Sequence, residues 1–328
     1  MLSYIIRRLF FMVPTLFLIS VVSFIALQLP PGDYLTSYAA QLSSQGESVD
    51  QEAIESLRER YGLGEPVYAQ YGKWVYGILT RGDWGQSLEW QKPVGQLIWE
   101  RLGLTLALAV FSLLISWLIA IPIGVYTATH QYSILDYLMS TFSFLGVGVP
   151  AFLWALMIMY FAQAVFGLNV GGLFSEKFIT APWSWDKVVD MFQHLWIPAL
   201  IVALVHTAAE LRTTRANLLD ELNKPYVELA RAKGLSEGRL IWKYPVRVAL
   251  NPFFSTVGWS LANRISDITL MSVVLSLETT GPMQLRALTS QDMYLAGSFL
   301  VLLSVLVVVG TLVSDVMLAW ADPRIRLE

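Results

Sequence analysis

The chain contains no cysteine, only three histidines and few charged residues. The absence of cysteine excludes disulfide bonds, thiolate metal sites and cysteine nucleophiles. The histidines do not recur at the spacing of zinc ligands, so we expect no metal site. Charged residues make up 14% of the 328 residues, against about 25% in an ordinary soluble domain. With 55% hydrophobic residues and a mean hydropathy of +0.54, this deficit indicates that the solvent of the chain is lipid.

The sequence also lacks the patterns of nucleotide and enzyme chemistry. A P-loop needs phosphate-cradling glycines ahead of a lysine and a hydroxyl residue, and the only Gly-Lys pair, at Gly72, is followed by Trp74. The apolar stretches hold no cluster of acid, base and nucleophile, which argues against a membrane-embedded enzyme. A net charge of −3 argues against a nucleic-acid partner. We therefore expect no nucleotide site, no bound cofactor and no catalysis in this chain.

Long apolar runs are what the sequence does contain. A bilayer core of about 30 Å is crossed by about 20 residues of helix, and such runs predict an all-α membrane protein with about six spans. We expect the spans at residues 1–29, 102–129, 137–165, 195–212, 248–277 and 293–320, the last five forming a core over 102–322. The first run is too long for a secretory signal, and Pro30 and Pro31 follow it instead of a small-residue cleavage site.

Lysine and arginine are distributed unequally between the loops. Basic residues concentrate in the first residues, in the loop at 213–247 and in the tail at 323–328, whereas the short loops on the other side hold only Lys177, Lys187 and Arg286. Because basic loops stay in the cytoplasm, this asymmetry predicts that both termini lie inside.

The segment at 30–101 is then extracytoplasmic. Its stretch Asp50–Tyr61 predicts a short charged helix, and aromatic residues cluster after it: Tyr68, Tyr71, Trp74, Tyr76, Trp84 and Trp90. Two interpretations stay open, an aromatic belt at the level of the lipid headgroups or a docking surface for an outer partner.

The loop at 213–247 has an amphipathic pattern. Apolar residues recur at helical spacing at Leu219, Leu222, Tyr226 and Leu229. Pro225 suits the first turn of a short helix, Gly234 suits the left-handed position that ends one, and Ser236 can cap the next helix. The pattern predicts a compact cytoplasmic knob. It fits either an amphipathic loop resting on anionic lipid or an element that docks into a cytoplasmic motor.

Several motifs resemble one family. The run YVELARAKGLSEGRL, which contains Glu228, Ala230 and Gly234, resembles the EAA loop of permease subunits of bacterial ABC importers. IIRRLFFMVPTLFLISVVSF with PPGD, ERYGLGEP, RGDWGQSL, PVGQLIWERLGLTLALA, GVGVPAFLWAL, WIPAL and DPRIRLE resemble successive parts of the dipeptide, oligopeptide and nickel permease family. The similarity covers nearly the whole chain and is closest to the B-type subunit.

The resemblance implies a type I ABC importer permease fold in a bacterial or archaeal cytoplasmic membrane. It implies a coupling helix that inserts into an ATP-binding subunit, with these residues of the EAA loop at the contact: Tyr226, Glu228, Ala230, Lys233, Gly234 and Leu235. It also implies a second, C-type permease subunit, two ATP-binding subunits that hold the ATP and magnesium, and an extracytoplasmic substrate-binding protein. Trp84, Tyr71 and Glu278 are candidates for contact with that binding protein.

The implied substrate is a peptide, with oligosaccharides as a second possibility and nickel complexes as a third. A transporter of another class, a secondary transporter driven by an ion gradient, would use Arg264, Asp267 and Glu278 to bind or relay ions. Such folds usually contain inverted repeats with paired broken helices, and no internal repeat is evident in this sequence.

Arg264 and Asp267 are charges within a predicted span. Each costs about 2.5 to 3.5 kcal/mol near the centre of a bilayer if it faces lipid. Three residues apart, they can pair on one helix face. We expect them, with Asn263, to line the solute pathway, while a purely structural pair is the alternative. His206, on the short fourth span, is expected to be a satisfied buried histidine.

Overall fold

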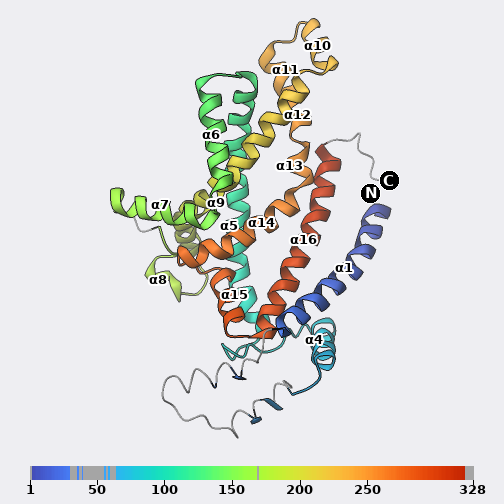
Figure 1. Cartoon of the computed structure of the whole chain (residues 1–328), viewed down its shortest axis with the longest axis vertical. Coiled ribbons are helices and arrows are strands. Elements are labelled where there is room, and N and C mark those ends of the chain that lie inside the picture. Colours follow the sequence, from blue (N-terminus) through green and yellow to red (C-terminus); the bar gives the residue numbers. More distant parts are fainter. Residues whose placement is uncertain are drawn as a thin grey trace. The chain divides into compact units, whose positions relative to one another are not determined.

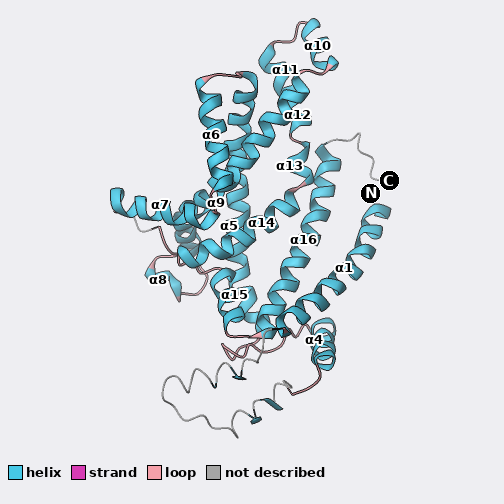
Figure 2. Ribbon diagram, in the orientation of Figure 1, coloured by secondary structure: helices cyan, strands magenta, loops and turns pink. Residues whose placement is uncertain are grey.

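The computed structural model describes residues 2–29, 35–36, 39, 55–56, 58–59, 64–167 and 170–321. Helices make up most of this part of the chain (Figure 2), and the only β-pairing among the helices and loops described is an isolated bridge between Gln86 and Pro93. The all-α prediction is therefore confirmed for these residues. The predicted helix at Asp50–Tyr61 lies largely outside them, and the tail at 323–328 lies wholly outside.

The chain divides into two compact units. One, here called the core unit, contains residues 104–278 and 309–328, and the other, the flanking unit, contains residues 2–103 and 279–308. The helices α5 (Val94–Thr129) and α16 (Met293–Ala321) each contribute residues to both units.

Among the described residues, four helices are long and apolar enough to cross a membrane: α1 (Leu2–Gln28), α5, α9 (Trp185–Leu222) and α16. A fifth candidate is a pair, α6 (Ile134–Gly148) and α7 (Ala151–Phe166), bent by 112° at the junction. The predicted straight span at 137–165 is thus broken. Pro150 explains the break, because proline disfavours helical backbone in the residue before it, and Val149 is extended.

The helix α9 is longer than the predicted span at 195–212, which lies within it. Ser184 caps its first turn by accepting a hydrogen bond from the Lys187 backbone N–H. The first turn of α9 contains polar residues, so its hydropathy is low. These residues form hydrogen bonds with the loop that holds α8 (Glu176–Ile179). Asp190 accepts from the Ser175 backbone N–H at 2.8 Å, and the Lys187 ammonium donates to the Ala181 carbonyl at 2.6 Å.

The core unit is held together by close helix crossings around α9 (Figure 1). A methyl group at Gly146 of α6 would lie 2.4 Å from the Ala208 Cβ, and one at Gly124 of α5 would lie 2.6 Å from the Thr214 Cβ. Small residues let helix backbones approach closely within a membrane, where packing rather than hydrophobic burial drives association.

The predicted span at 248–277 is divided in the structure. Short helices α12 (Pro245–Ala249) and α13 (Asn251–Ser255) precede α14 (Val257–Val274). Pro245 and Pro252 lack the backbone N–H that a continuous helix requires, and each stands in the first turn of its own short helix. The apolar composition of this stretch concealed these breaks.

In the flanking unit, α1 packs against α4 (Val67–Arg81) through aromatic side chains. Phe24 stacks on Trp74 at 5.5 Å between ring centroids and meets the edge of Tyr71 at 5.4 Å. The Tyr71 hydroxyl bonds with the Ser20 hydroxyl at 2.8 Å. Two members of the predicted aromatic cluster therefore serve in helix packing, a third role beside the belt and the docking surface.

A buried aspartate fixes the loop after α4. Asp292, directly before α16, accepts hydrogen bonds from the Ser87 hydroxyl at 2.5 Å and the Glu89 backbone N–H at 3.2 Å. Burial raises the pKa of this carboxyl group. Arg286, on α15 (Thr280–Thr289), pairs with Glu89 at 2.6 Å and lies over the Trp90 ring.

The crossing of α14 and α16 within the core unit is tight enough to test. A methyl group at Gly258 would lie 2.1 Å from the Gly310 carbonyl carbon, and the Gly258 backbone N–H donates to the Ser314 hydroxyl at 2.7 Å. We predict that Gly258→Ala lowers the free energy of unfolding by about 1–3 kcal/mol through overpacking, measured by thermal unfolding in detergent. Gly103→Ala is the control, because nothing lies within 4 Å of a methyl group there; equal stability of both variants would refute the prediction.

Candidate functional site

A short helical element follows α9 at one end of the core unit. It consists of α10 (Pro225–Ala232), the turn at Lys233 and Gly234, and α11 (Glu237–Lys243) (Figure 1). Pro225 stands in the first turn of α10, and Gly234 follows its end with a φ of +79°, the left-handed conformation that glycine adopts without strain. Ser236 occupies the N-cap of α11 without a side-chain capping bond.

One face of α10 is buried against α11. Val227 and Ala230 pack on Leu240, whose side chain is fully buried, and Leu235 covers the edge of this small core. A second core joins the element to the rest of the unit, because Val246 and Ala249 of α12 pack against Leu218 of α9 and the end of α5. Through these two cores the buried face of α10 is fixed to the rest of the unit, and the opposite face of α10 is exposed.

The prediction of one continuous apolar face is wrong. It would have contained Leu219, Leu222, Tyr226 and Leu229. The chain breaks between α9 and α10, so the first two leucines pack partly buried on the core around α12, while Tyr226 and Leu229 are exposed on α10. The helical spacing of apolar residues continues across the break between α9 and α10. In the sequence, only Asn223 and Pro225 indicate that break.

The exposed face of α10 combines apolar and charged groups. Leu229 is 58% exposed, and Glu228 and Lys233 are exposed beside it. Arg231 donates to Glu237 of α11 at 2.5 Å, and this hydrogen bond lowers the pKa of the Glu237 carboxyl and raises that of the Arg231 guanidinium. The structure thus brings the predicted EAA-loop residues together on α10 and the turn after it, with Ala230 buried beneath.

A second candidate region is a charged cluster among α5, α9 and α14 of the core unit. Arg264 is 1% exposed, and its guanidinium donates to Glu210 and to the Ser116 hydroxyl, each at 2.6 Å. Asp267 lies 3.2 Å from the imidazole Nε2 of His206. The pairing of Arg264 with Asp267 expected from their spacing is therefore replaced by two pairings across helices.

The remaining predicted pathway and docking residues differ in their surroundings. Asn263 is exposed on α14, and Asp267 is partly exposed. Trp84 is half-buried, and its carbonyl accepts a hydrogen bond from Trp74 at 3.2 Å. Tyr71 is engaged with α1, as described above, and Glu278 is half-buried after α14.

Sequence reasoning missed Glu210 and Asp136. Glu210 lies near the end of the predicted fourth span at 195–212. A carboxylate at that position is a possible partner for the buried charge of Arg264. Asp136, at the start of α6, holds Arg215 of α9 through two hydrogen bonds of 2.7 and 2.9 Å. Arg215 had been counted only as an inner-loop charge.

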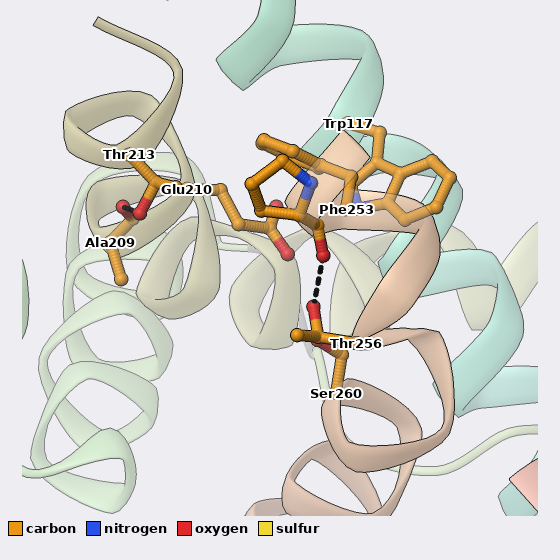
Figure 3. A pocket seen from close by; sticks show the side chains of 8 residues that line it. Trp117, Ala209, Glu210, Thr213, Phe253, Thr256 and Ser260 are labelled. Carbon is orange, nitrogen blue, oxygen red and sulfur yellow. Dashed lines mark hydrogen bonds between the residues drawn. The ribbon is translucent and has the colours of Figure 1, made fainter. Parts of the chain in front are cut away.

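A cavity of about 240 Å³ adjoins Glu210 in the core unit (Figure 3). Its lining residues are Trp117, Ala209, Glu210, Thr213, Pro252, Phe253, Thr256 and Ser260. The Glu210 carboxylate points across it toward Thr256.

The fold resembles that of a membrane subunit of an ABC transporter. A chain of the MetNI methionine ABC transporter, solved in inward-facing conformations, superposes with a TM-score of 0.52 at 15% sequence identity, covering 69% of this chain and 97% of that chain. The fold of this part of the chain thus has a counterpart among ABC transporters.

The chain belongs to the family of binding-protein-dependent transport system inner membrane components. That family matches residues 120–327, and its N-terminal counterpart matches residues 1–109. The chain is therefore a multi-pass protein of the cytoplasmic membrane, and the family implies ATPase and substrate-binding partners. The relationship predicted from the motifs is confirmed.

Full-length relatives carry transport names. The oligopeptide transport system permease protein AppB of Bacillus subtilis (strain 168) is 33% identical, covering 99% of this chain and 100% of the relative. The dipeptide transport system permease protein DppB of Alkalihalophilus pseudofirmus is 30% identical with the same coverage. The inner membrane ABC transporter permease protein YejB of Escherichia coli O157:H7 is 30% identical over 99% of each chain.

The core beneath α10 generates one prediction. Leu240→Ala removes the fully buried side chain on which Val227 and Ala230 pack, and such truncations cost about 2–5 kcal/mol. We expect faster amide hydrogen exchange across 225–234 with unchanged exchange in α9. Arg239→Ala, at an exposed position of the same helix, is the control. Unchanged exchange at α10 in the leucine variant would contradict the packing described.

The buried ion pair between Arg264 and Glu210 leads to a second prediction. Arg264→Met leaves the Glu210 carboxylate without its cation, and breaking a buried pair from one side costs about 3–5 kcal/mol. The double variant with Glu210→Gln removes the uncompensated charge and should recover a large part of the loss in thermal unfolding. If the losses of the two single variants simply add in the double variant, the two groups do not interact as the geometry indicates.

Proposed function

We propose that this chain is one of two membrane-spanning subunits of an ATP-driven importer that takes up peptides. The observation that carries the proposal is the full-length similarity to relatives named for oligopeptide and dipeptide transport, combined with a short helix whose buried face is anchored and whose other face is free. Oligosaccharide uptake is the alternative that the substrate assay below distinguishes.

The proposal includes an arrangement in the membrane. Six spans with both termini in the cytoplasm place α10 and α11 on the cytoplasmic side, with the short helices before α14 counted as part of the fifth span. A related C-type subunit completes the pathway, two ATP-binding subunits hold ATP and magnesium, and an outer protein delivers the substrate. This chain itself binds no cofactor. Trp84, Tyr71 and Glu278 are the proposed contacts with the outer protein.

We infer that α10 transmits the motion of the ATP-binding subunits. A helix can transmit motion only if it is fixed to the rest of the subunit. The packing of Val227 and Ala230 on Leu240 fixes α10 to α11. The exposed Leu229 offers an apolar contact at its centre, and Glu228 and Lys233 offer charged contacts beside it. Exposed apolar side chains ringed by charged residues are typical of protein interfaces.

The charged cluster is proposed to lie along the solute pathway. Arg264 and Asp267 each have a partner on α9, which agrees with the general behaviour of intramembrane charges, since these pair with other groups. Asn263 completes this proposed set on α14.

The coupling proposal is tested by a surface substitution. Leu229→Asp places a charge at the centre of the exposed face without touching the core of α10, so the fold should survive while the ATP-binding subunits dissociate or lose peptide-stimulated ATP hydrolysis. Apolar-to-charged changes at the centre of an interface commonly cost more than about 2 kcal/mol. The measurement is co-purification of the co-expressed complex, followed by peptide uptake and ATPase activity in proteoliposomes.

Arg239→Ala serves as the matched control on the neighbouring helix. Full assembly and coupled uptake by Leu229→Asp would refute the role of α10. Solute uptake by the native chain without ATP-binding subunits, driven by a proton or sodium gradient alone, would instead establish the secondary-transporter interpretation. Uptake of oligosaccharides but not of peptides would overturn the proposed substrate class alone.

A further inference from the structure

The cavity beside Glu210 is too small for a whole substrate and large enough for one chemical group. Ligand pockets commonly measure about 300–1,000 Å³, whereas this cavity measures about 240 Å³. It can admit the end of a flexible molecule whose remainder lies outside. The lining determines which kind of end it accepts.

Two of the three hydroxyl groups of the lining present acceptors rather than donors, and the third, that of Ser260, can donate or accept. The Thr213 hydroxyl donates its proton to the Ala209 carbonyl at 3.0 Å, and the Thr256 hydroxyl donates to the Pro252 carbonyl at 2.7 Å (Figure 3). Because each hydroxyl has one proton, these two oxygens retain only lone pairs for a ligand. A group that donates hydrogen bonds is favoured, and a carboxylate is disfavoured.

Glu210 adds a negative charge that acts on the cavity at short range. Its Oε1 accepts from Arg264 at 2.6 Å, whereas its Oε2 is buried and has no hydrogen-bond partner in the part of the chain that the structure describes. With histidine counted as neutral, the surrounding cluster holds two carboxylates, Glu210 and Asp267, against one guanidinium, Arg264. One further positive charge would balance the cluster.

The aromatic lining is compatible with a cation as well. Trp117 lines the cavity and is held edge-to-face by Phe253 and Phe254, at 5.6 and 6.1 Å between ring centroids. Indole rings attract ammonium groups through their π-face. Two acceptor-only hydroxyls, a carboxylate and an aromatic ring together favour a group that donates hydrogen bonds and carries a positive charge.

We propose that this cavity is a subsite for a primary ammonium group of the transported peptide, contributed by its amino terminus or by a lysine side chain. This inference rests on the proposed peptide transport and assigns a specific contact to it. Glu210 provides the charge, Thr213 and Thr256 accept hydrogen bonds, and Trp117 covers the alkyl stem.

The absence of cysteine in the chain makes a direct test possible. Ser260→Cys places a single thiol in the cavity lining of the assembled complex, with companion subunits freed of cysteine. Its rates of reaction with 2-aminoethyl and 2-sulfonatoethyl methanethiosulfonate are measured and normalised to those of a free thiol. We expect the cationic reagent to be favoured by a factor on the order of ten or more. Gln131→Cys, exposed in the turn between α5 and α6, should show no such preference.

Two variants of Glu210 separate charge from structure. Glu210→Gln should reduce the preference at position 260 to that of the control site, whereas Glu210→Asp, which keeps the charge, should retain it. Retention of the preference in Glu210→Gln, or its absence in the parent, would overturn the proposal. ATP hydrolysis and chromatographic behaviour of each variant show that the complex is intact.

Protection by peptides identifies the source of the ammonium group. Trialanine, its N-acetylated form and an N-acetylated peptide with one lysine are compared for their ability to slow labelling at position 260. Protection by trialanine alone assigns the amino terminus, and protection by the lysine peptide assigns the side chain. Equal protection by all three, or by none, would overturn the subsite.

The ammonium subsite and the peptide-importer function are tested by different outcomes. If the complex imports peptides while labelling shows no charge preference, the subsite is wrong and the importer remains. If the cationic preference depends on Glu210 but the complex transports no peptide, the proposed function is wrong and with it the assignment of the ammonium group to a peptide.

Discussion

The arrangement of the core unit depends on the ion pair between Arg264 and Glu210. A charge buried away from water costs several kcal/mol unless partners compensate it. The guanidinium finds those partners on α9 and on α5, at Ser116, so three helices must keep their register to satisfy one side chain. The helix α9 also leads directly to α10. The buried charges and the exposed helix α10 are therefore supported by the same helix.

The sequence predicted the helical class and most of the long apolar helices, because hydropathy records which segments lipid can surround. It did not predict where these helices bend or end. Val149 before Pro150, and the prolines at 245 and 252, divide stretches that are apolar throughout. The polar first turn of α9 was not predicted, because its charged residues Lys187 and Asp190 lower the hydropathy. They form hydrogen bonds with a loop that comes near only in the folded chain.

The same distinction applies to the candidate sites. The local shape of the segment at 225–234 was predictable, because Pro225 and Gly234 have conformational preferences that do not depend on distant partners. The partner of Arg264 was not found, because Glu210 lies on another helix and spacing within α14 favoured Asp267. Contacts between helices follow from rotation and register, and a single sequence records neither.

The interrupted backbone from α11 to α14 limits what can surround this part of the chain. Pro245 and Pro252 have no backbone N–H, so the carbonyl groups one turn earlier lose their regular helical partner. Hydrocarbon offers no hydrogen bonds, so irregular backbone persists at membrane depth only under a cover of protein or water. Acyl chains are therefore disfavoured wherever these breaks lie at membrane depth, whereas the exposed apolar side chains of α1 offer a surface that lipid can solvate.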